Sequence, residues 1–156
     1  MGLPRKIAPC ALAALCGLAV SLIPTCATKD YFQQLELSEV AVYVNAAPGI
    51  PARGVLSIRN YATKADDLLA AQSDSFKKIS FREQYREGFD IKTRTLPAVH
   101  LPAGVVTALR QEAVFLFLEQ PSKPPRPGDT VRLRLQFRLS GPKTVLAPVK
   151  LSLDSD

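Results

Sequence analysis

The chain has 156 residues, which corresponds to one ordinary domain and a short preceding segment. Its formal net charge is +6, and removal of a leader that contains Arg5 and Lys6 leaves 18 basic against 14 acidic residues, or +4. So mild a positive balance argues against a nucleic-acid-binding protein.

The N-terminal segment predicts export. A short basic stretch precedes the apolar run Ala11–Ile23, whose dozen or so residues suit a secretory signal and fall short of the ~20 of a membrane span. Pro24 ends the run, and the small residues that follow permit cleavage after Ala27. The sequence therefore predicts three segments, which are a signal peptide at 1–27, a linker at 28–34 and a folded domain at 35–156.

Cys26 leaves a second interpretation open. A cysteine just after an apolar leader is the lipidation site of bacterial lipoproteins, although Pro24 and Thr25 fit the usual lipobox poorly. An uncleaved anchor is the third alternative. All three cysteines lie in the leader, so the mature domain contains no disulfide. We expect an exported protein, either periplasmic or anchored to a membrane through Cys26.

The rest of the chain predicts an all-β domain. Turn residues recur about every ten positions, which favours a Greek-key sandwich or barrel. Helix is limited to a short turn around Asp66–Ser75. The expected strands and apolar runs are Leu35–Val44, Gly54–Asn60, Leu68–Ala71, Lys78–Tyr85, Phe89–Thr95, Val105–Leu109, Ala113–Leu118, Thr130–Leu139 and Thr144–Leu153.

Three of these strands carry further information. Thr130–Leu139 alternates apolar and polar residues strictly, which predicts one buried and one solvent-facing side. Ala113–Leu118 is almost continuously apolar, so we expect it to be covered on both faces. Pro148 cannot donate a ladder hydrogen bond and predicts an edge or a bulge in the last strand.

The order of several short motifs resembles a known family. The motifs are "LSEVAVYVNAAPG", "GVLSIRNYATKADDLLAA", "KKISFRE", "LPAG" and "VFLFLEQPSKPPRPGDTVRLRLQF". Together they are similar to PCu(A)C (DUF461) proteins, periplasmic copper chaperones that deliver copper to the CuA centre of oxidases. The resemblance spans Leu35–Leu153 and implies a cupredoxin-like β fold, a non-enzymatic role and an envelope partner.

The resemblance also implies where copper ligands would stand. Family members use a His, a Met about ten residues later, and a His-x-Met about twenty residues further on, because imidazole nitrogen and thioether sulfur suit soft Cu(I). In this chain the matching positions are Phe81; Ile91, Lys92 or Thr93; and Phe115 and Phe117.

A phenyl ring offers no lone pair to a metal. We therefore expect the family copper site to be lost, and no cofactor to be bound. Phe81, Phe115 and Phe117 are expected to gather where the metal would lie. There they either extend the core or form an apolar patch that docks a partner. The rival hypothesis keeps copper at a divergent site around His100, the only histidine.

Other polar residues predict surface features. His100 and the Asp66–Asp67 pair are expected in exposed turns. Arginines on the expected strand Thr130–Leu139 and on the two strands of an expected hairpin would form one positive surface for anionic lipid or an acidic partner if these faces adjoin. Otherwise they are ordinary solvated faces. These arginines are Arg82, Arg94, Arg132, Arg134 and Arg138.

Catalytic motifs are missing from the sequence. It has no G-x-S-x-G, H-E-x-x-H or P-loop pattern, and no cysteine after Ala27. The sequence thus predicts a non-enzymatic envelope protein that binds a protein or a membrane surface and no nucleic acid. Copper handling at a divergent site is the first alternative, and a lipoprotein with a basic or apolar docking surface is the second.

Overall fold

The computed structural model describes residues 34–47 and 49–152, so the predicted signal peptide, most of the linker and Cys26 lie outside the described residues. The described part is all β and contains no helix able to span a membrane. Its strands are β1 (Leu35–Val44), β2 (Ala52–Asn60), β3 (Asp66–Gln72), β4 (Phe76–Glu87), β5 (Asp90–Leu96), β6 (Val99–Leu101), β7 (Val106–Leu109), β8 (Val114–Pro121), β9 (Thr130–Phe137) and β10 (Pro142–Leu151).

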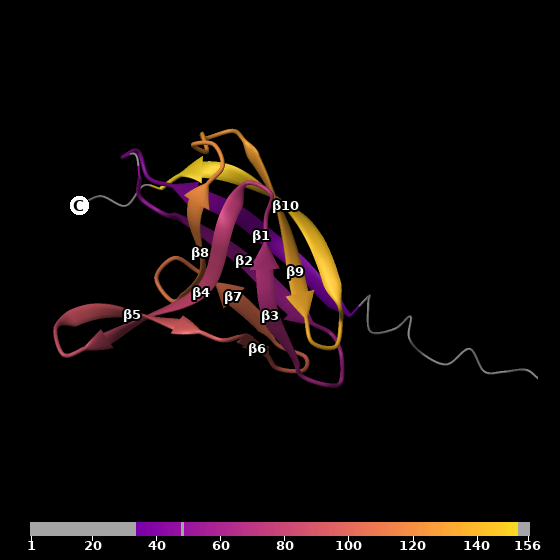
Figure 1. The fold of residues 1–156 in the computed structure, drawn as a ribbon. Helices are drawn as coiled ribbons and strands as arrows, with labels where there is room; N and C mark the ends of the chain where they lie inside the picture. The colour runs from indigo at the N-terminus through magenta and orange to yellow at the C-terminus, as the bar shows by residue number, and fades with distance from the viewer. Residues whose placement is uncertain (1–33, 48, 153–156) are drawn as a thin grey trace, which may run out of the picture.

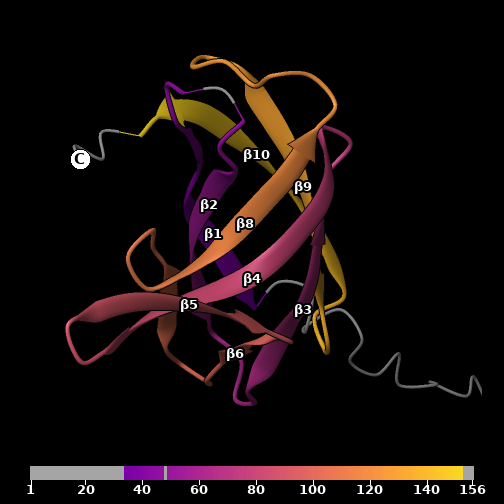
Figure 2. The same ribbon diagram turned by 60° about the vertical axis from the view of Figure 1, so that its left-hand side comes forward.

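The strands form one continuous, strongly curved sheet. Its order is β5-β4-β8-β2-β1-β10-β9-β3-β6, and β7 adds to β2 beside β8. Neighbouring strands are antiparallel except β1 and β10, which are parallel. The curvature brings β3 against β4, although the two are not paired, so the sheet closes around a core (Figures 1 and 2). The predicted cupredoxin-like all-β class is confirmed.

The core follows from the alternation of side chains along the strands. On β9, the side chains of Val131, Leu133, Leu135 and Phe137 are buried, while the intervening residues are exposed. Each successive side chain points to the opposite face of a strand, so this period of two places one whole row inside. The predicted two-sided burial of β8 is also confirmed, because adjacent residues on its two faces are both buried.

The structure corrects several local predictions. Asp66 and Asp67 begin strand β3 rather than lying in a turn or a short helix, and His100 lies on β6, a three-residue strand that pairs with β3. Pro148 is neither at an edge nor in a bulge. It lies where β10 stops pairing with β9 and starts pairing with β1, so its missing N–H removes little from either ladder.

Gly54 is required by the close approach of two strands. A Cβ added at Gly54 would lie 2.9 Å from the Cβ of Leu116 on β8, inside the core. Gly54→Ala is therefore expected to lower the free energy of unfolding by about 1–3 kcal/mol, the range for overpacked cores. Urea denaturation monitored by circular dichroism would measure the loss. An unchanged midpoint would mean that β2 and β8 separate without strain at this position.

Candidate functional site

The outer face of β2, β8 and β4 carries the most distinctive group of side chains. In the strand register, Arg53 of β2 lies opposite Phe117 of β8, and Phe115 of β8 lies opposite Arg82 of β4. Directly opposed residues in antiparallel strands project to the same face. Two arginines and two phenylalanines from three strands therefore meet on one face of the sheet.

These four residues contact one another as cation–π pairs. The Cζ atom of Arg82 lies 3.5 Å from the centre of the Phe117 ring, and that of Arg53 lies 5.0 Å from the centre of the Phe115 ring. The two rings are 6.4 Å apart in an edge-on arrangement. Guanidinium groups bind aromatic faces in this geometry through the negative potential of the ring. We refer to these residues as the arginine–phenylalanine cluster.

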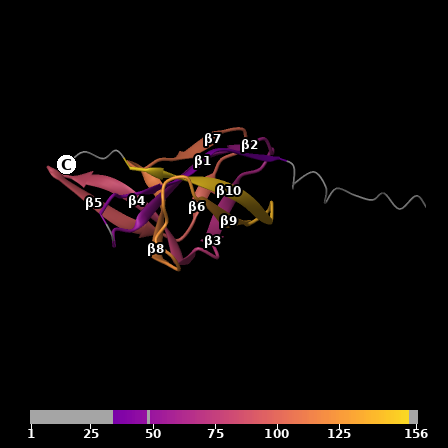
Figure 3. The ribbon, with the colours of Figure 1, turned by 90° about the horizontal axis from the view of Figure 1, so that it is seen from above.

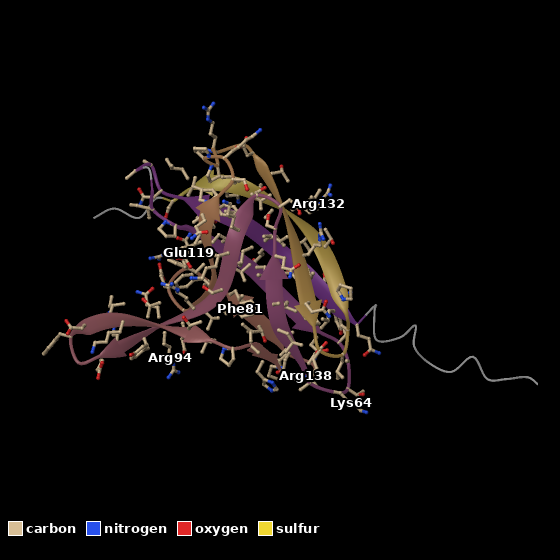
Figure 4. The ribbon with its side chains drawn as sticks, in the orientation of Figure 1. Lys64, Phe81, Arg94, Glu119, Arg132 and Arg138 are labelled. Atoms are coloured by element: carbon tan, nitrogen blue, oxygen red, sulfur yellow. The ribbon has the colours of Figure 1, made fainter. Side chains whose placement is uncertain are left out.

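A carboxylate borders the cluster. Glu119 Oε2 lies 3.1 Å from Lys78 Nζ and 3.8 Å from a terminal nitrogen of Arg82. Neither ion pair has hydrogen-bond geometry, because the buried Glu119 Oε2 atom has no hydrogen-bond partner among the described residues. The buried Arg82 Nε and Ser80 Oγ atoms also have none there. Figure 4 shows Glu119 on β8 above Phe81 on β4.

The expectation that Phe81 joins Phe115 and Phe117 is wrong. Phe81 lies opposite Leu116 and is only 4% exposed, as part of the hydrophobic core. Its ring therefore points to the inner face of the sheet, whereas Phe115 and Phe117 point to the outer face. Arg82, one residue further on, shares the outer face with them. A shift of one residue along a strand exchanges the faces, and sequence alignment alone could not resolve it.

The residues proposed for the second family position lie elsewhere. Ile91, Lys92 and Thr93 are exposed on β5, in the hairpin that β4 and β5 form. This hairpin extends away from the body of the domain (Figure 3), and Phe89 at its turn is fully exposed. The residue of β5 directly opposite Arg82 is Thr95. In the strand register, Ile91 and Thr93 therefore do not lie opposite any residue of the arginine–phenylalanine cluster.

Comparison with known proteins identifies the family. The family model described as "Putative lipoprotein LpqE-like" matches residues 35–149, most of the chain and nearly all of its folded part. This chain belongs to the LpqE-like family. No curated protein sequence matches it significantly.

Solved structures confirm the fold of this LpqE-like protein. The copper-bound PCuAC domain from PmoF2 is 18% identical, with a TM-score of 0.64 over 76% of this chain and 94% of that domain. The apo PCuAC domain from PmoF1 is 17% identical, with a TM-score of 0.65 over 76% and 95%. Cu(I)-bound DR1885 from Deinococcus radiodurans is 20% identical, with a TM-score of 0.60 over 81% and 87%. At these identities the likeness shows the fold alone.

The predicted continuous basic surface is not present in the LpqE-like domain. Strands β4 and β5 do not pair with β9: β8, β2, β1 and β10 lie between them along the sheet, and β3 lies between β4 and β9 where the sheet closes. In Figure 4, Arg94 lies at the opposite side of the domain from Arg132 and Arg138. Several of the arginines also meet carboxylates, as in the pairs Arg94–Glu83 and Arg134–Asp74. The cations are therefore dispersed and partly neutralised.

His100 belongs to a polar group at the β3–β6 edge. Its Nδ1 donates to Asp67 Oδ1 at 2.9 Å, and Arg138 Nε donates to Asp67 Oδ2 at 2.8 Å. The His100 side chain is 67% exposed, as expected, although it lies on a strand. No group of three His, Cys, Asp or Glu side chains suited to a metal ion occurs in the part of the chain that the structure describes.

Asp66 is a structural carboxylate that sequence reasoning missed. It is 3% exposed and accepts hydrogen bonds from the backbone N–H groups of Asp67, Leu139 and Ser140 at 2.7, 2.8 and 3.0 Å. Burial raises the pKa of Asp66, but the hydrogen bonds from Leu139, Ser140 and Asp67 outweigh it, so the net pKa is below the usual range. Asp66 therefore fastens the β9–β10 turn to the start of β3.

The two neighbouring carboxylates predict acid sensitivity. Hydrogen bonds from His100 and Arg138 also hold the pKa of Asp67 below its usual range. A carboxylate whose pKa is lower in the folded than in the unfolded state stabilises the fold at pH values above its unfolded-state pKa of about 3.9. This contribution is lost as the pH falls through the folded-state pKa. We expect the urea midpoint to fall steeply below about pH 4.

The variant Asp67→Asn provides the control for this pH effect. An amide can still accept from Arg138 but does not titrate, so the stability of this variant should depend less on pH in the acid range than that of the wild type. Denaturation midpoints at a series of pH values measure both slopes. Identical slopes would show that Asp67 titrates alike in the folded and unfolded states.

Proposed function

We propose that this LpqE-like protein is a non-enzymatic lipoprotein of the cell envelope, anchored through Cys26. In this proposal it acts as a binding or accessory module on a PCuAC-type fold whose copper site has been replaced. The observation that carries the proposal is the arginine–phenylalanine cluster at Phe115 and Phe117, the positions that the family resemblance assigns to the His-x-Met ligands.

The chemistry of the cluster opposes Cu(I) binding. Phenyl rings have no lone pair, while imidazole and thioether groups bind soft Cu(I) well. The guanidinium groups of Arg53 and Arg82 add positive charge beside the rings. A Cu(I) ion that entered here would meet two cations, and the only nearby donors would be the oxygens of Glu119 and Ser80, which suit a soft metal poorly. The cluster thus replaces a metal centre with a packed, charged surface.

The sequence and the family support the other parts of the proposal. Downstream of the leader the chain has one histidine, no cysteine and no methionine, and it lacks recognisable catalytic motifs. The matching family is described in terms of lipoproteins, and Cys26 follows an apolar leader segment as lipidation requires. Binding rather than catalysis is the role that these residues fit.

Copper titration tests the loss of the metal site. The chain from Thr28 to Asp156 would be titrated with Cu(I) against a chromogenic chelator under anaerobic conditions. We expect no stoichiometric binding at or below micromolar concentrations. Tight binding that His100→Ala abolishes would instead establish a divergent copper site, and tight binding that survives His100→Ala would place the metal on other residues. Either result would refute the proposal.

Metabolic labelling tests the anchor. Full-length protein expressed in a bacterium is expected to incorporate radiolabelled palmitate and to partition into detergent. Cys26→Ser is expected to abolish both properties, because the acyl chains are attached through that sulfur. Unlabelled wild-type protein in the soluble periplasmic fraction would support cleavage after Ala27 instead and would refute the anchor.

A further inference from the structure

Exposed apolar side chains gather at the end of the domain where β1 begins. Tyr61, Val105, Val106 and Leu139 are each between 46% and 56% exposed there. The Tyr61 N–H donates to the carbonyl of Gln34 at 2.7 Å, directly before β1. We call this region the tether end, because the chain leaves the domain here toward Cys26.

Hydrogen bonds and strand pairing place the other three residues at the same end. Val105 accepts a hydrogen bond from the N–H of Asn60, next to Tyr61, and Val106 lies opposite Arg59 on β2. The N–H of Leu139 donates a hydrogen bond to Asp66, the residue that comes directly after the loop 61–65. The apolar side chains therefore surround the point from which the linker departs.

The charges at the tether end favour an anionic surface. Lys64 and Arg59 are exposed at this end, and Arg138, which Figure 4 also labels here, is exposed but paired with Asp67. The carboxylates at this end are engaged within the protein: Asp66 is buried under backbone donors, Asp67 binds His100 and Arg138, and the exposed Glu36 accepts a hydrogen bond from Tyr61 Oη at 2.7 Å. Exposed cations near a membrane each add attraction to anionic lipid headgroups.

The linker is short enough to hold this end near a bilayer. Eight residues separate Cys26 from Leu35, so the linker spans at most about 30 Å when fully extended. That reach is smaller than the diameter of about 35 Å expected for a domain of this size. The β4–β5 hairpin lies at the opposite end of the domain from the start of β1 (Figure 3). A lipidated Cys26 would therefore bring the tether end to the membrane first.

We propose that the tether end docks on the surface of an anionic phospholipid bilayer, with Tyr61, Val105 and Val106 at the headgroup level and Lys64 beside them. The inference rests on the lipid anchor proposed above. An aromatic ring with a polar tip suits the interface between water and lipid. Docking fixes the orientation of the anchored domain, so the arginine–phenylalanine cluster and the β4–β5 hairpin are presented to partners rather than to lipid.

Fluorescence quenching on the lipidated full chain tests this orientation. The processed lipoprotein would have no free thiol, because its only cysteine is acylated, so one introduced cysteine can carry the dye. Thr63→Cys labels the tether end and Asp90→Cys labels the hairpin end, and both sites are exposed. Each labelled protein is reconstituted into vesicles of phosphatidylcholine and phosphatidylglycerol that contain doxyl-labelled lipid. We expect several-fold stronger quenching at position 63 than at position 90.

A matched variant tests the apolar patch itself. Val105→Asp with Val106→Asp, in the Thr63→Cys background, should remove most of the quenching, while the unfolding midpoint shows that the half-exposed sites still allow folding. Vesicles of phosphatidylcholine alone should give weaker quenching than those with phosphatidylglycerol. Equal quenching at positions 63 and 90, or stronger quenching at 90, would overturn the docking inference.

The same samples separate failure of docking from failure of the anchor. Unlipidated protein would lack the acyl mass in a mass spectrum: chain cleaved after Ala27 would have lost Cys26 altogether, and uncleaved chain would carry additional dye on the cysteines of the leader. That result would refute the proposed anchor and the docking inference with it. Acylated protein whose position 63 remains unquenched would refute docking alone and would leave the tether end for a protein partner.

Discussion

Replacing three residues of the arginine–phenylalanine cluster is expected to create a Cu(I) site. The triple variant Arg82→His, Phe115→His and Phe117→Met places two imidazoles on directly opposed residues of β4 and β8, with a thioether two residues further along the same face. Opposed side chains have Cβ atoms about 5 Å apart, which two ligands of one metal can span. Binding tighter than micromolar in a chelator competition is the expected result, against none for the wild type.

The control variant differs from this triple variant only in which residue of β4 becomes histidine. Phe81→His, Phe115→His and Phe117→Met follows the alignment of the sequences, but Phe81 points into the core beside Leu116. This variant should bind Cu(I) far more weakly and should be less stable, because it buries an imidazole in place of a phenyl ring. Equal copper affinity in the two variants would contradict the assignment of Arg82 to the outer face.

Asp66→Ala is expected to be the most destabilising polar substitution in the domain. The change removes the acceptor of three backbone N–H groups, two of which belong to the β9–β10 turn. A buried donor left without a partner costs about 1–3 kcal/mol, so a loss of about 3 kcal/mol in the free energy of unfolding is expected. Urea denaturation at neutral pH measures it.

Asp67→Ala is the matched control for Asp66. Its carboxylate pairs with the exposed His100 and Arg138, and exposed ion pairs contribute about 1 kcal/mol or less. We expect Asp67→Ala to lower stability much less than Asp66→Ala. The opposite order would mean that the turn at Leu139 and Ser140 is held by something other than Asp66.

The proposed replacement of a metal site by cation–π packing would have a consequence for function. Arg53 and Arg82 cover the phenyl rings on the outer face, so the sheet surface there is filled and positively charged. In the proposed function, such a surface would bind an anionic group or an acidic partner segment rather than transfer a metal ion to an acceptor. The scaffold is thereby suited to recognition, which agrees with the proposed accessory role in the envelope.

Some elements of the fold could be read from the sequence because their patterns are local. The bounds predicted for β1 coincide with the structure, and the alternation from Thr130 defined the buried row of β9. The continuous apolar run of β8 predicted its two covered faces. In each case the side-chain period of two, or its absence, reflects how many faces of the strand are buried.

The sequence by itself determined the all-β class, the resemblance to copper chaperones, and a domain with one histidine and no methionine after the predicted leader. Only the tertiary structure decided that Phe81 lies in the core while Arg82 joins Phe115 and Phe117, because strand register depends on pairing between distant segments. It also decided that Asp66 is buried and that β4 and β9 do not pair. Composition and spacing fix local patterns; which side chains meet depends on the pairing of strands far apart in the chain.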